Sequence, residues 1–206
     1  MRVRIKELID AATTMYNDVV YDLPKGFSDI EIASQSIGFS MPSDLQTGAL
    51  LKALAGSKPK ANVLEIGTGT GLATAWILAG MDADSSLLSI DNESTYQTVA
   101  QRVLGTDIRL RLICTDAGEW LEENSDQKFD LIFADAWPGK YANLDAALNS
   151  LTVGGFYVID DMLPQLNWPE GHSDNIDKLV GDLESRDDLQ IVRMAWSTGI
   201  LIATKK

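Results

Sequence analysis

The stretch Val63-Leu64-Glu65-Ile66-Gly67-Thr68-Gly69-Thr70-Gly71 joins an apolar run to three alternating glycines, and Leu72-Ala73-Thr74-Ala75-Trp76-Ile77-Leu78 follows it directly. This pattern predicts a buried strand, a tight turn and the first turns of a helix. Glycine allows positive φ angles and lets a ligand approach the bare backbone. The helix N-terminus adds unpaired N–H groups and a partial positive charge. The stretch therefore favours a nucleotide-like ligand at the turn, and a glycine-rich turn without a ligand is the alternative.

The spacing of the glycines separates this turn from two other nucleotide-binding motifs. A dinucleotide fingerprint, G-x-G-x-x-G/A, needs Gly or Ala where the chain has Leu72. A phosphate-binding P-loop needs a Lys followed by Ser or Thr, and no Lys follows these glycines. The motif therefore disfavours a nicotinamide dinucleotide or a nucleoside triphosphate, and a nucleotide-dependent oxidoreductase stays only as an alternative class.

The composition indicates a globular protein with an acidic surface. The 206 residues are 45% hydrophobic, and the formal net charge is −13. Partners rich in phosphate are held by Lys and Arg, so nucleic acids and anionic membranes are poor candidates. Cys114 is the single cysteine and lies in an apolar run, which excludes a disulfide framework. Because the sequence has no apolar leader and no apolar stretch of about 18 residues, we expect a cytoplasmic protein.

Strand-like and helix-like segments alternate along the chain, which predicts an α/β, doubly wound, Rossmann-like fold with helices on both faces of a mostly parallel sheet. We expect strands at 62–66, 86–90, 109–114, 129–134, 154–160, 189–196 and 199–204. We expect helices at 2–21, 43–56, 71–80, 94–104, 117–123, 141–150 and 173–185. The last two of these seven strands are close enough to form a hairpin, so the last strand runs antiparallel. We interpret residues 1–206 as one domain, in which 1–56 form a helical segment that packs on the core.

Several carboxylates follow the predicted strands, at the edge where open α/β sheets bind ligands. Asp91 ends the second strand and can accept hydrogen bonds from both hydroxyls of a ribose. Capping of the next helix by Asp91 or Asn92 is a compatible alternative. Asp135, Asp160 and Asp161 follow the fourth and fifth strands, where they would raise one another's pKa if unpaired. A hard cation such as Mg²⁺ would relieve this repulsion and could activate a substrate hydroxyl.

The E-x-G-x-G-x-G sequence at residues 65–71 resembles motif I of the class I S-adenosylmethionine-dependent methyltransferases. Further along, F-D-L-I-F-x-D-A at 129–136 and G-G-x-x-x-x-D-D at 154–161 follow in the order found in the catechol and caffeoyl-CoA O-methyltransferase family. The resemblance covers about residues 36–162. It implies S-adenosylmethionine as the cofactor, the methyltransferase variant of the doubly wound sheet, and methyl transfer to a small hydroxylated acceptor.

The resemblance also implies roles for individual residues. The segment 40–48 resembles a loop that closes over the cofactor, Asp116 and the backbone of Ala117 would contact the adenine, and Trp137 would lie against that ring. Capping of a helix is the alternative for Asp116. The residues expected to bind the cofactor are Met41, Glu65, Gly67, Thr68, Gly69, Gly71, Asp91, Asn92, Asp116, Ala117, Asp135 and Trp137. The metal ligands expected from the same resemblance are Asp135, Asp160 and Asp161.

Two positions depart from the family pattern. Asp161 replaces the asparagine of the usual metal site, which adds a negative charge. Pro138 stands where the family has a catalytic lysine. Lys140 lies two residues further on and would need a shifted loop to reach the site.

His172 is the only histidine and follows the fifth predicted strand. An imidazole titrates near neutral pH and suits a general base that takes the proton of an acceptor hydroxyl. A solvent-exposed loop histidine beside the next helix is the alternative. With Asp135 and Lys140, His172 completes the set of candidate catalytic residues, and Trp137, Met162 and Trp168 are candidates for an apolar acceptor pocket.

These observations together predict an enzyme: an S-adenosylmethionine-dependent O-methyltransferase acting on a small phenol- or catechol-like acceptor, assisted by Mg²⁺ or a similar divalent cation. Methylation of nucleic-acid bases is disfavoured because residues 135–138 lack the [DN]-P-P-[YF] signature. The alternatives are a methyltransferase for a different small acceptor and a cofactor-binding protein without transferase activity, which Pro138 favours. The apolar face of residues 5–19 packs either on the sheet of its own chain or in a homodimer.

Overall fold

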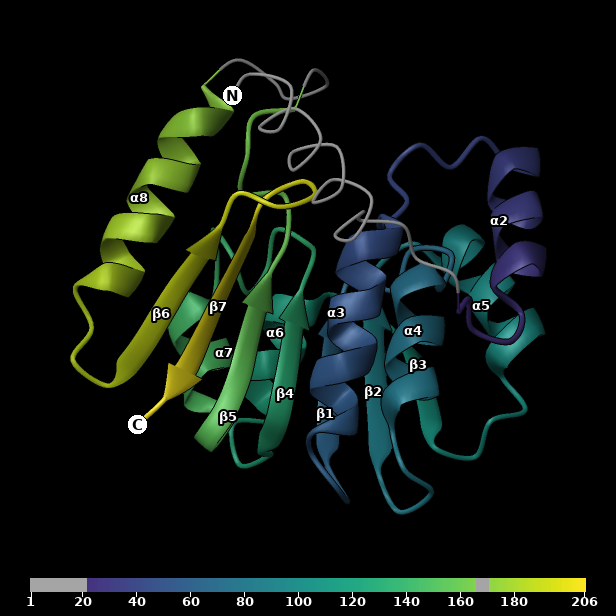
Figure 1. The fold of residues 1–206 in the computed structure, drawn as a ribbon, viewed down its shortest axis with the longest axis horizontal. Helices are drawn as coiled ribbons and strands as arrows, with labels where there is room; N and C mark the ends of the chain where they lie inside the picture. The colour runs from purple at the N-terminus through teal and green to yellow at the C-terminus, as the bar shows by residue number, and fades with distance from the viewer. Residues whose placement is uncertain (1–21, 166–170) are drawn as a thin grey trace, which may run out of the picture.

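The chain adopts a three-layer α/β/α arrangement in which a twisted sheet lies between two sets of helices (Figure 1). The computed structural model describes residues 22–165 and 171–206, so the helix expected at 2–21 lies outside the described residues. The strands are β1 (Asn62–Ile66), β2 (Ser86–Asp91), β3 (Leu110–Cys114), β4 (Phe129–Ala134), β5 (Leu151–Ile159), β6 (Leu189–Met194) and β7 (Ile200–Lys205). The helices are α2 (Phe27–Ser36), α3 (Leu45–Gly56), α4 (Leu72–Gly80), α5 (Ser94–Leu104), α6 (Ala117–Glu123), α7 (Leu144–Asn149) and α8 (His172–Glu184).

The strands form one seven-stranded sheet in the order β3-β2-β1-β4-β5-β7-β6. Strands β1 to β5 pair in parallel, whereas β7 runs antiparallel to both of its neighbours. This confirms the predicted doubly wound sheet with an antiparallel last strand. The strand order reverses between β1 and β4, and such a reversal opens a crevice at the carboxyl ends of the two strands. The glycine turn after β1 therefore lies beside the loop after β4.

The helices divide between the two faces of the sheet because successive side chains of a strand point in opposite directions. Val63 of β1 packs in a core with α2, α3, α4 and α5, whereas Leu64 packs in a core with α6, α7 and α8. Since both faces are covered, β1 is buried at four successive positions and does not alternate between apolar and polar. In the first core, Trp76 of α4 meets Phe27 of α2 with 5.9 Å between the ring centroids.

Helix α2 is absent from the sequence-based prediction. Its sequence is short and rich in polar residues, which gives a weak helical signal. The helix buries Phe27, Ile30 and Ala33, three residues apart along one face, against α4 and α5. Tertiary packing of this face stabilises the helix, as it does for most short helices in proteins. No helix in residues 22–165 and 171–206 is both long enough and apolar enough to cross a membrane.

Two helix starts differ from the prediction by two residues or more. Helix α3 starts at Leu45, two residues later than expected, because Asp44 is its N-cap and accepts at Oδ1 a hydrogen bond from the Thr47 N–H at 2.8 Å. Helix α7 starts at Leu144, three residues later than expected, because residues 137–142 form a tight loop closed by backbone hydrogen bonds. Because both helices start later than expected, Ser43 and Tyr141 lie in loops, and both line the cavity at the carboxyl edge of the sheet.

Strand β5 starts three residues earlier than predicted, at Leu151. The Gly154-Gly155 pair, which suggested the start of the strand, lies in an irregular part of the pairing where the register with β4 shifts. Gly154 has a φ of +76°, which favours glycine. Beyond this irregularity the two strands pair regularly to their ends. Asp135 and Asp160 therefore follow neighbouring strands at the same edge of the sheet.

Candidate active site

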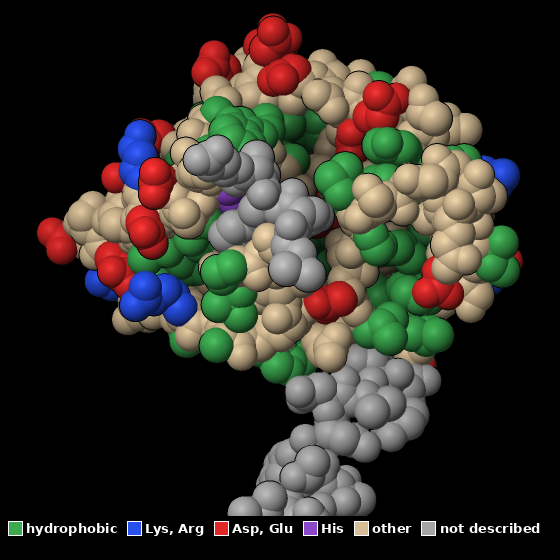
Figure 2. Space-filling view, turned by 90° about the horizontal axis from the view of Figure 1, so that it is seen from above, with side chains coloured by type: hydrophobic (Ala, Val, Ile, Leu, Met, Phe, Trp, Pro, Cys, Tyr) green, Lys and Arg blue, Asp and Glu red, His purple; other side chains and the backbone are tan. Residues whose placement is uncertain are grey.

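A cavity of about 600 Å³ opens at the carboxyl ends of the central strands. Its wall comes from residues 39–44, the glycine turn after β1, the loops 91–96 and 135–141, and residues that follow β5. Figure 2 looks onto this end of the molecule and shows many acidic side chains around it. The predicted site residues that line the cavity are Met41, Gly67, Thr68, Gly69, Asp91, Asn92, Asp135, Trp137, Lys140, Asp160, Asp161 and His172. Those that lie outside the cavity wall are Glu65, Gly71, Asp116 and Ala117.

The glycine turn is held by the neighbouring strand β2. The Gly67 N–H donates to the Ile90 carbonyl at 2.8 Å, and the Gly69 N–H donates to Asp91 Oδ2 at 2.7 Å. Gly67 has a φ of +102°, and a Cβ there would lie 2.9 Å from the carbonyl oxygen of Asp135. A side chain at this position would therefore push apart the ends of β1 and β4. The packing of the protein itself requires this glycine, in addition to any ligand.

Asp91 connects the glycine turn to the start of α5. Its Oδ2 accepts the Gly69 N–H, and its Oδ1 accepts the Glu93 N–H at 2.8 Å. Glu93 is the N-cap residue of α5, so neither Asp91 nor Asn92 has the capping role considered for them. Each carboxylate oxygen can accept two hydrogen bonds. Asp91 therefore keeps an acceptor position on each oxygen, as binding of two ribose hydroxyls requires.

Glu65 lies beneath the glycine turn and is completely buried. Its Oε2 accepts hydrogen bonds from the hydroxyls of Thr74 at 2.6 Å and Ser89 at 2.5 Å. Burial raises the pKa of Glu65 to about 8, and the negative charges of Asp135 and Asp91 add to this effect. At neutral pH the carboxyl group is therefore protonated in the folded protein. It links β1 to β2 and α4 and supports the turn from below.

Three other residues predicted to bind the cofactor have local structural roles. Asp116 is the N-cap residue of α6, where its Oδ1 accepts the Glu119 N–H at 2.9 Å. Ala117, the first residue of the helix, is buried. Gly71 is the N-cap of α4, and a Cβ there would lie 2.7 Å from the Cβ of Ala100. The structure thus shows Asp116 in the capping role that was the alternative to an adenine contact.

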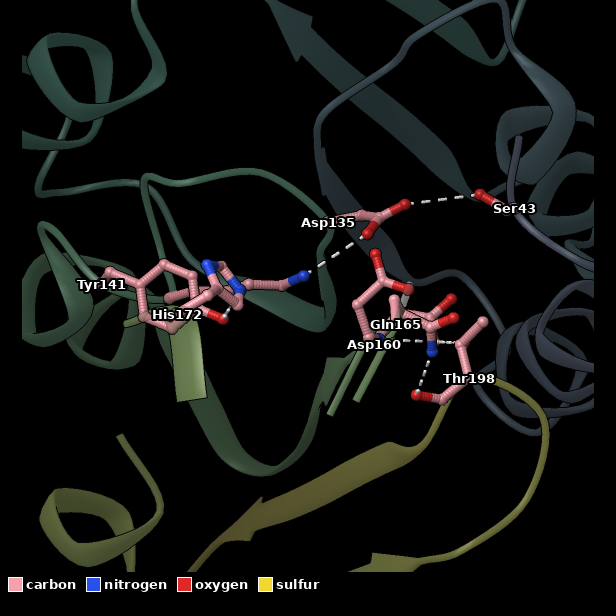
Figure 3. A network of polar contacts seen from close by, with 9 residues as sticks. Ser43, Asp135, Tyr141, Asp160, Gln165, His172 and Thr198 are labelled. Carbon is pink, nitrogen blue, oxygen red and sulfur yellow. Dashed lines mark hydrogen bonds and ion pairs between the residues drawn. The ribbon is translucent and has the colours of Figure 1, made fainter. Parts of the chain in front are cut away.

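Asp135 lies in the cavity wall between Ser43 on one side and the Tyr141–His172 pair on the other (Figure 3). Lys140 Nζ is 3.4 Å from Asp135 Oδ1, and Ser43 Oγ is 3.4 Å from Oδ2. Burial raises the pKa of Asp135, and the ammonium group of Lys140 opposes this rise. The ion pair places a cation in a cavity wall that is otherwise acidic.

Lys140 reaches the site because the loop after β4 turns back on itself. Its N–H donates to the Trp137 carbonyl at 3.3 Å. Gly139 has a φ of +84°, and its carbonyl accepts a hydrogen bond from the buried Tyr157 hydroxyl at 2.5 Å. The shifted loop that Lys140 needs is therefore present. It brings the amine to Asp135 with only 6% of the lysine side chain exposed.

Two of the three aspartates expected to bind a metal, Asp135 and Asp160, accept hydrogen bonds from protein donors. Asp160 Oδ1 accepts hydrogen bonds from the Thr198 hydroxyl and from the Asp161 N–H, the latter at 2.8 Å. Burial raises the pKa of Asp160, and the bond from Thr198 opposes this rise. In residues 22–165 and 171–206, no three His, Cys, Asp or Glu side chains are grouped so that they could hold a metal ion. The predicted Mg²⁺ site does not fit this arrangement.

Aromatic side chains form the part of the wall next to Lys140. The hydroxyl of Tyr141 and Nε2 of His172 are 3.1 Å apart, and the two ring centroids are 5.3 Å apart. Burial raises the pKa of Tyr141 to about 12, so this hydroxyl keeps its proton. Trp137, which the resemblance places against an adenine, packs edge-on against Tyr141 with 4.7 Å between centroids. His172 is the first residue of α8, half-buried, and lines the cavity, so it is not an exposed loop histidine, and its role as a general base stays a prediction.

Sequence reasoning missed three polar residues of the site: Ser43, Tyr141 and Thr198. Ser43 lies in the segment expected to close over the cofactor, and that position was a usable signal for a side chain at the site. Tyr141 was concealed by the expectation that a helix starts there. Thr198 gave no local signal, because the order of β5, β7 and β6 brings the hairpin beside Asp160. Trp168 lies outside the described residues.

Comparison with known proteins finds similarity to methyltransferases. Residues 64–162 match a family model described as a methyltransferase domain. A protein of Mycolicibacterium vanbaalenii named "Putative O-methyltransferase" is 35% identical over 117 residues, which are 54% of this chain and 52% of that protein. The chain therefore spans about half the length of the curated relatives it matches.

Solved structures share the fold over nearly the whole chain. The O-methyltransferase from Bacillus cereus in complex with SAH has a TM-score of 0.79 at 17% identity, covering 95% of this chain and 97% of that chain. The O-methyltransferase TomG from Streptomyces achromogenes, in complex with SAM, has a TM-score of 0.78 at 19% identity, covering 95% and 96%. Residues 64–162 are thus similar to a methyltransferase domain, and nearly the whole chain shares the fold of these O-methyltransferases of solved structure.

Proposed function

We propose that this protein transfers a methyl group from S-adenosylmethionine to a hydroxyl group of a small phenol- or catechol-like molecule. The observation that carries the proposal is a single cavity whose wall includes both the glycine turn with Asp91 and the polar groups of Lys140 and His172. The net charge of −13 favours a small acceptor over a phosphate-rich polymer, because phosphates would be repelled.

The residues around the glycine turn fit the nucleoside part of this cofactor. Asp91 keeps acceptor positions for the two ribose hydroxyls, and the N-terminal segment with Met41 forms a wall above the turn. When bound, S-adenosylmethionine supplies a methyl group that its positively charged sulfur already activates. The aspartates of the cavity wall favour a ligand with such a positive charge.

The residues of the loop after β4 and the start of α8 fit the acceptor. The Lys140 ammonium would lower the energy of an oxygen atom that gains negative charge. The imidazole of His172 is suited to receive the hydroxyl proton, and the hydrogen bond with Tyr141 orients its ring. Trp137 and Tyr141 offer ring surfaces to a planar acceptor. The main task of these residues is to orient the acceptor and to exclude water.

Calorimetry and a transfer assay test the proposal. We expect the purified chain to bind S-adenosylhomocysteine, not to bind NAD, and to methylate at least one member of a panel of phenols and catechols. Absence of S-adenosylhomocysteine binding by folded protein would refute the proposal. Binding without transfer to any acceptor would instead support a cofactor-binding protein without transferase activity, the reading that Pro138 favours.

A further inference from the structure

Lys140 occupies the part of the site where the family resemblance expects a divalent cation. Its Nζ is 3.4 Å from Asp135 Oδ1, and its charge also acts on Asp160. Asp160 and Asp161 in turn act electrostatically on Asp135. One ammonium group therefore acts on Asp135 and Asp160, two of the three carboxylates that were expected to bind Mg²⁺, and Asp161 acts on the same Asp135.

The burial of this ammonium group is unusual for the chain. Among the Lys and Arg side chains of residues 22–165 and 171–206, Lys140 alone is buried. Lys60 also forms an ion pair, with Asp84 at 3.3 Å, but its side chain is 75% exposed. Removing an ammonium group from water is costly unless opposite charges surround it. Asp135 and Asp160 meet this condition, so the lysine and these two aspartates depend on one another.

The hydrogen bonds of the aspartates also favour an internal cation over a metal. A divalent metal needs several oxygen atoms that point to one position. Asp160 Oδ1 instead faces the Thr198 hydroxyl and the Asp161 N–H. The Ser43 hydroxyl lies 3.4 Å from Asp135 Oδ2, and Lys140 lies near the other oxygen. Each of these contacts occupies one carboxylate oxygen, and with Lys140 in place the remaining oxygens need no metal to balance their charge.

We propose that Lys140 is the resident cation of this site and that the protein works without a divalent metal. The ammonium group balances the acidic residues and holds the acceptor oxygen by a hydrogen bond, the position that a metal would otherwise take. The proposal rests on the proposed function for the identity of the reaction. It accounts for both departures from the family pattern, because the negative charge added by Asp161 and the loss of a lysine at Pro138 are matched by one amine at position 140.

Binding of Mn²⁺, measured by calorimetry and electron paramagnetic resonance on the full chain with and without S-adenosylhomocysteine, tests the proposal directly. The wild-type protein is expected to bind no stoichiometric Mn²⁺. The Lys140→Met variant is expected to gain one Mn²⁺ per chain, and the double variant Lys140→Met/Asp135→Asn to lose it again. The Lys60→Met variant removes an exposed lysine and is the matched control, expected to behave as the wild type.

A second measurement uses turnover. With any acceptor that the transfer assay identifies, excess EDTA is expected to change the wild-type rate by less than about twofold, whereas removal of a catalytic metal would abolish it. The Mn²⁺ measurement needs no acceptor, and S-adenosylhomocysteine binding is recorded separately. Failure of the proposed function is therefore distinguishable from failure of this inference.

Two results would overturn the inference. The first is one Mn²⁺ bound by the wild-type protein and lost in Asp135→Asn. The second is a Lys140→Met variant that is folded, as shown by its melting curve and by its retained S-adenosylhomocysteine binding, and still binds no Mn²⁺. If Lys140→Met does not fold, Lys140→Gln removes the charge with a polar side chain and takes its place in the same measurements.

Discussion

The part of the cavity around the glycine turn and the part around Lys140 are built in different ways. The first is fixed by backbone groups, since the N–H groups of Gly67 and Gly69 bond to β2 and to Asp91 at its end. The second is assembled from side chains of separate segments, among them Ser43, Lys140, His172 and Thr198. Backbone geometry tolerates few substitutions, whereas side chains can be exchanged one at a time. Under the proposed function, the glycine turn would preserve a common cofactor site while the other part could adapt to different acceptors.

Gly67→Ala should produce the largest combined loss of stability and of affinity for S-adenosylhomocysteine. It would disrupt the backbone-built part of the cavity, which is the glycine turn fixed by the N–H groups of Gly67 and Gly69. The added Cβ would meet the Asp135 carbonyl oxygen at 2.9 Å in a backbone with φ of +102°. We expect a loss of about 2–4 kcal/mol in the free energy of unfolding. Affinity for S-adenosylhomocysteine should fall at least about 100-fold, since the turn can no longer keep its shape. Chemical denaturation and calorimetry measure the two effects.

Gly154→Ala is the matched control for this variant. Gly154 also has a positive φ, of +76°, but a Cβ there would meet no atom within 4 Å. We expect only the strain of the left-handed backbone, about 1 kcal/mol, and unchanged affinity for S-adenosylhomocysteine. Equal loss of affinity in the two variants would show that general destabilisation, and not the glycine turn, controls cofactor binding.

His172→Ala tests the side-chain-built part. If the imidazole receives the acceptor proton, turnover should fall about 100-fold while affinity for S-adenosylhomocysteine stays the same. Tyr141→Phe removes the hydroxyl 3.1 Å from Nε2 and should give a smaller loss of turnover, with a shifted pH profile. Steady-state kinetics and calorimetry separate the two quantities. Unchanged turnover in His172→Ala would remove this residue from the mechanism.

The same division explains how far the sequence could predict this molecule. The strand, glycine turn and helix at 62–80, and Asp91 at the end of β2, follow from local patterns whose backbone conformations are restricted. The tight loop that carries Lys140 does not, because it depends on the buried Tyr157 hydroxyl 18 residues further along the chain. Thr198 reaches Asp160 only through the strand order of the sheet. Contacts between distant side chains are set by the complete fold and leave little local signal.

Two variants, Asp91→Ala and Asp116→Ala, test which of the two aspartates belongs to the cofactor site. Asp91 lines the cavity and has acceptor positions left, so its loss should weaken S-adenosylhomocysteine binding about 10- to 100-fold. Asp116 caps α6 and lies outside the cavity wall, so its loss should cost about 1 kcal/mol of stability and leave binding unchanged. If both variants weaken binding equally, Asp116 contacts the cofactor as the family resemblance implies.

Glu65→Gln tests, through the pH dependence of stability, whether the support beneath the glycine turn is neutral. Because burial raises the pKa of Glu65 from 4.5 to about 8, the folded protein binds this proton more tightly than the unfolded chain does. The contribution of Glu65 to stability is therefore complete below pH 4.5 and declines as the pH rises to about 8, by roughly 1.4 kcal/mol per pH unit at most.

Glutamine has the shape of the protonated acid but does not ionise, so the variant should lose this pH dependence. Its oxygen can accept the bonds from Thr74 and Ser89, and its NH₂ group takes the place of Oε1, which has no hydrogen-bond partner among the described residues. Melting temperatures of the variant and the wild type should be similar near about pH 5, and the variant should melt higher near about pH 9. Glu123→Gln, an exposed change on α6, should follow the wild type at both pH values.

A wild-type protein whose stability does not decline relative to Glu65→Gln over this range would mean that Glu65 is ionised in the folded state. The backbone-built part of the cavity would then contain a buried negative charge beneath the turn, and the attraction of a sulfonium ligand would have a source there as well as in the cavity wall.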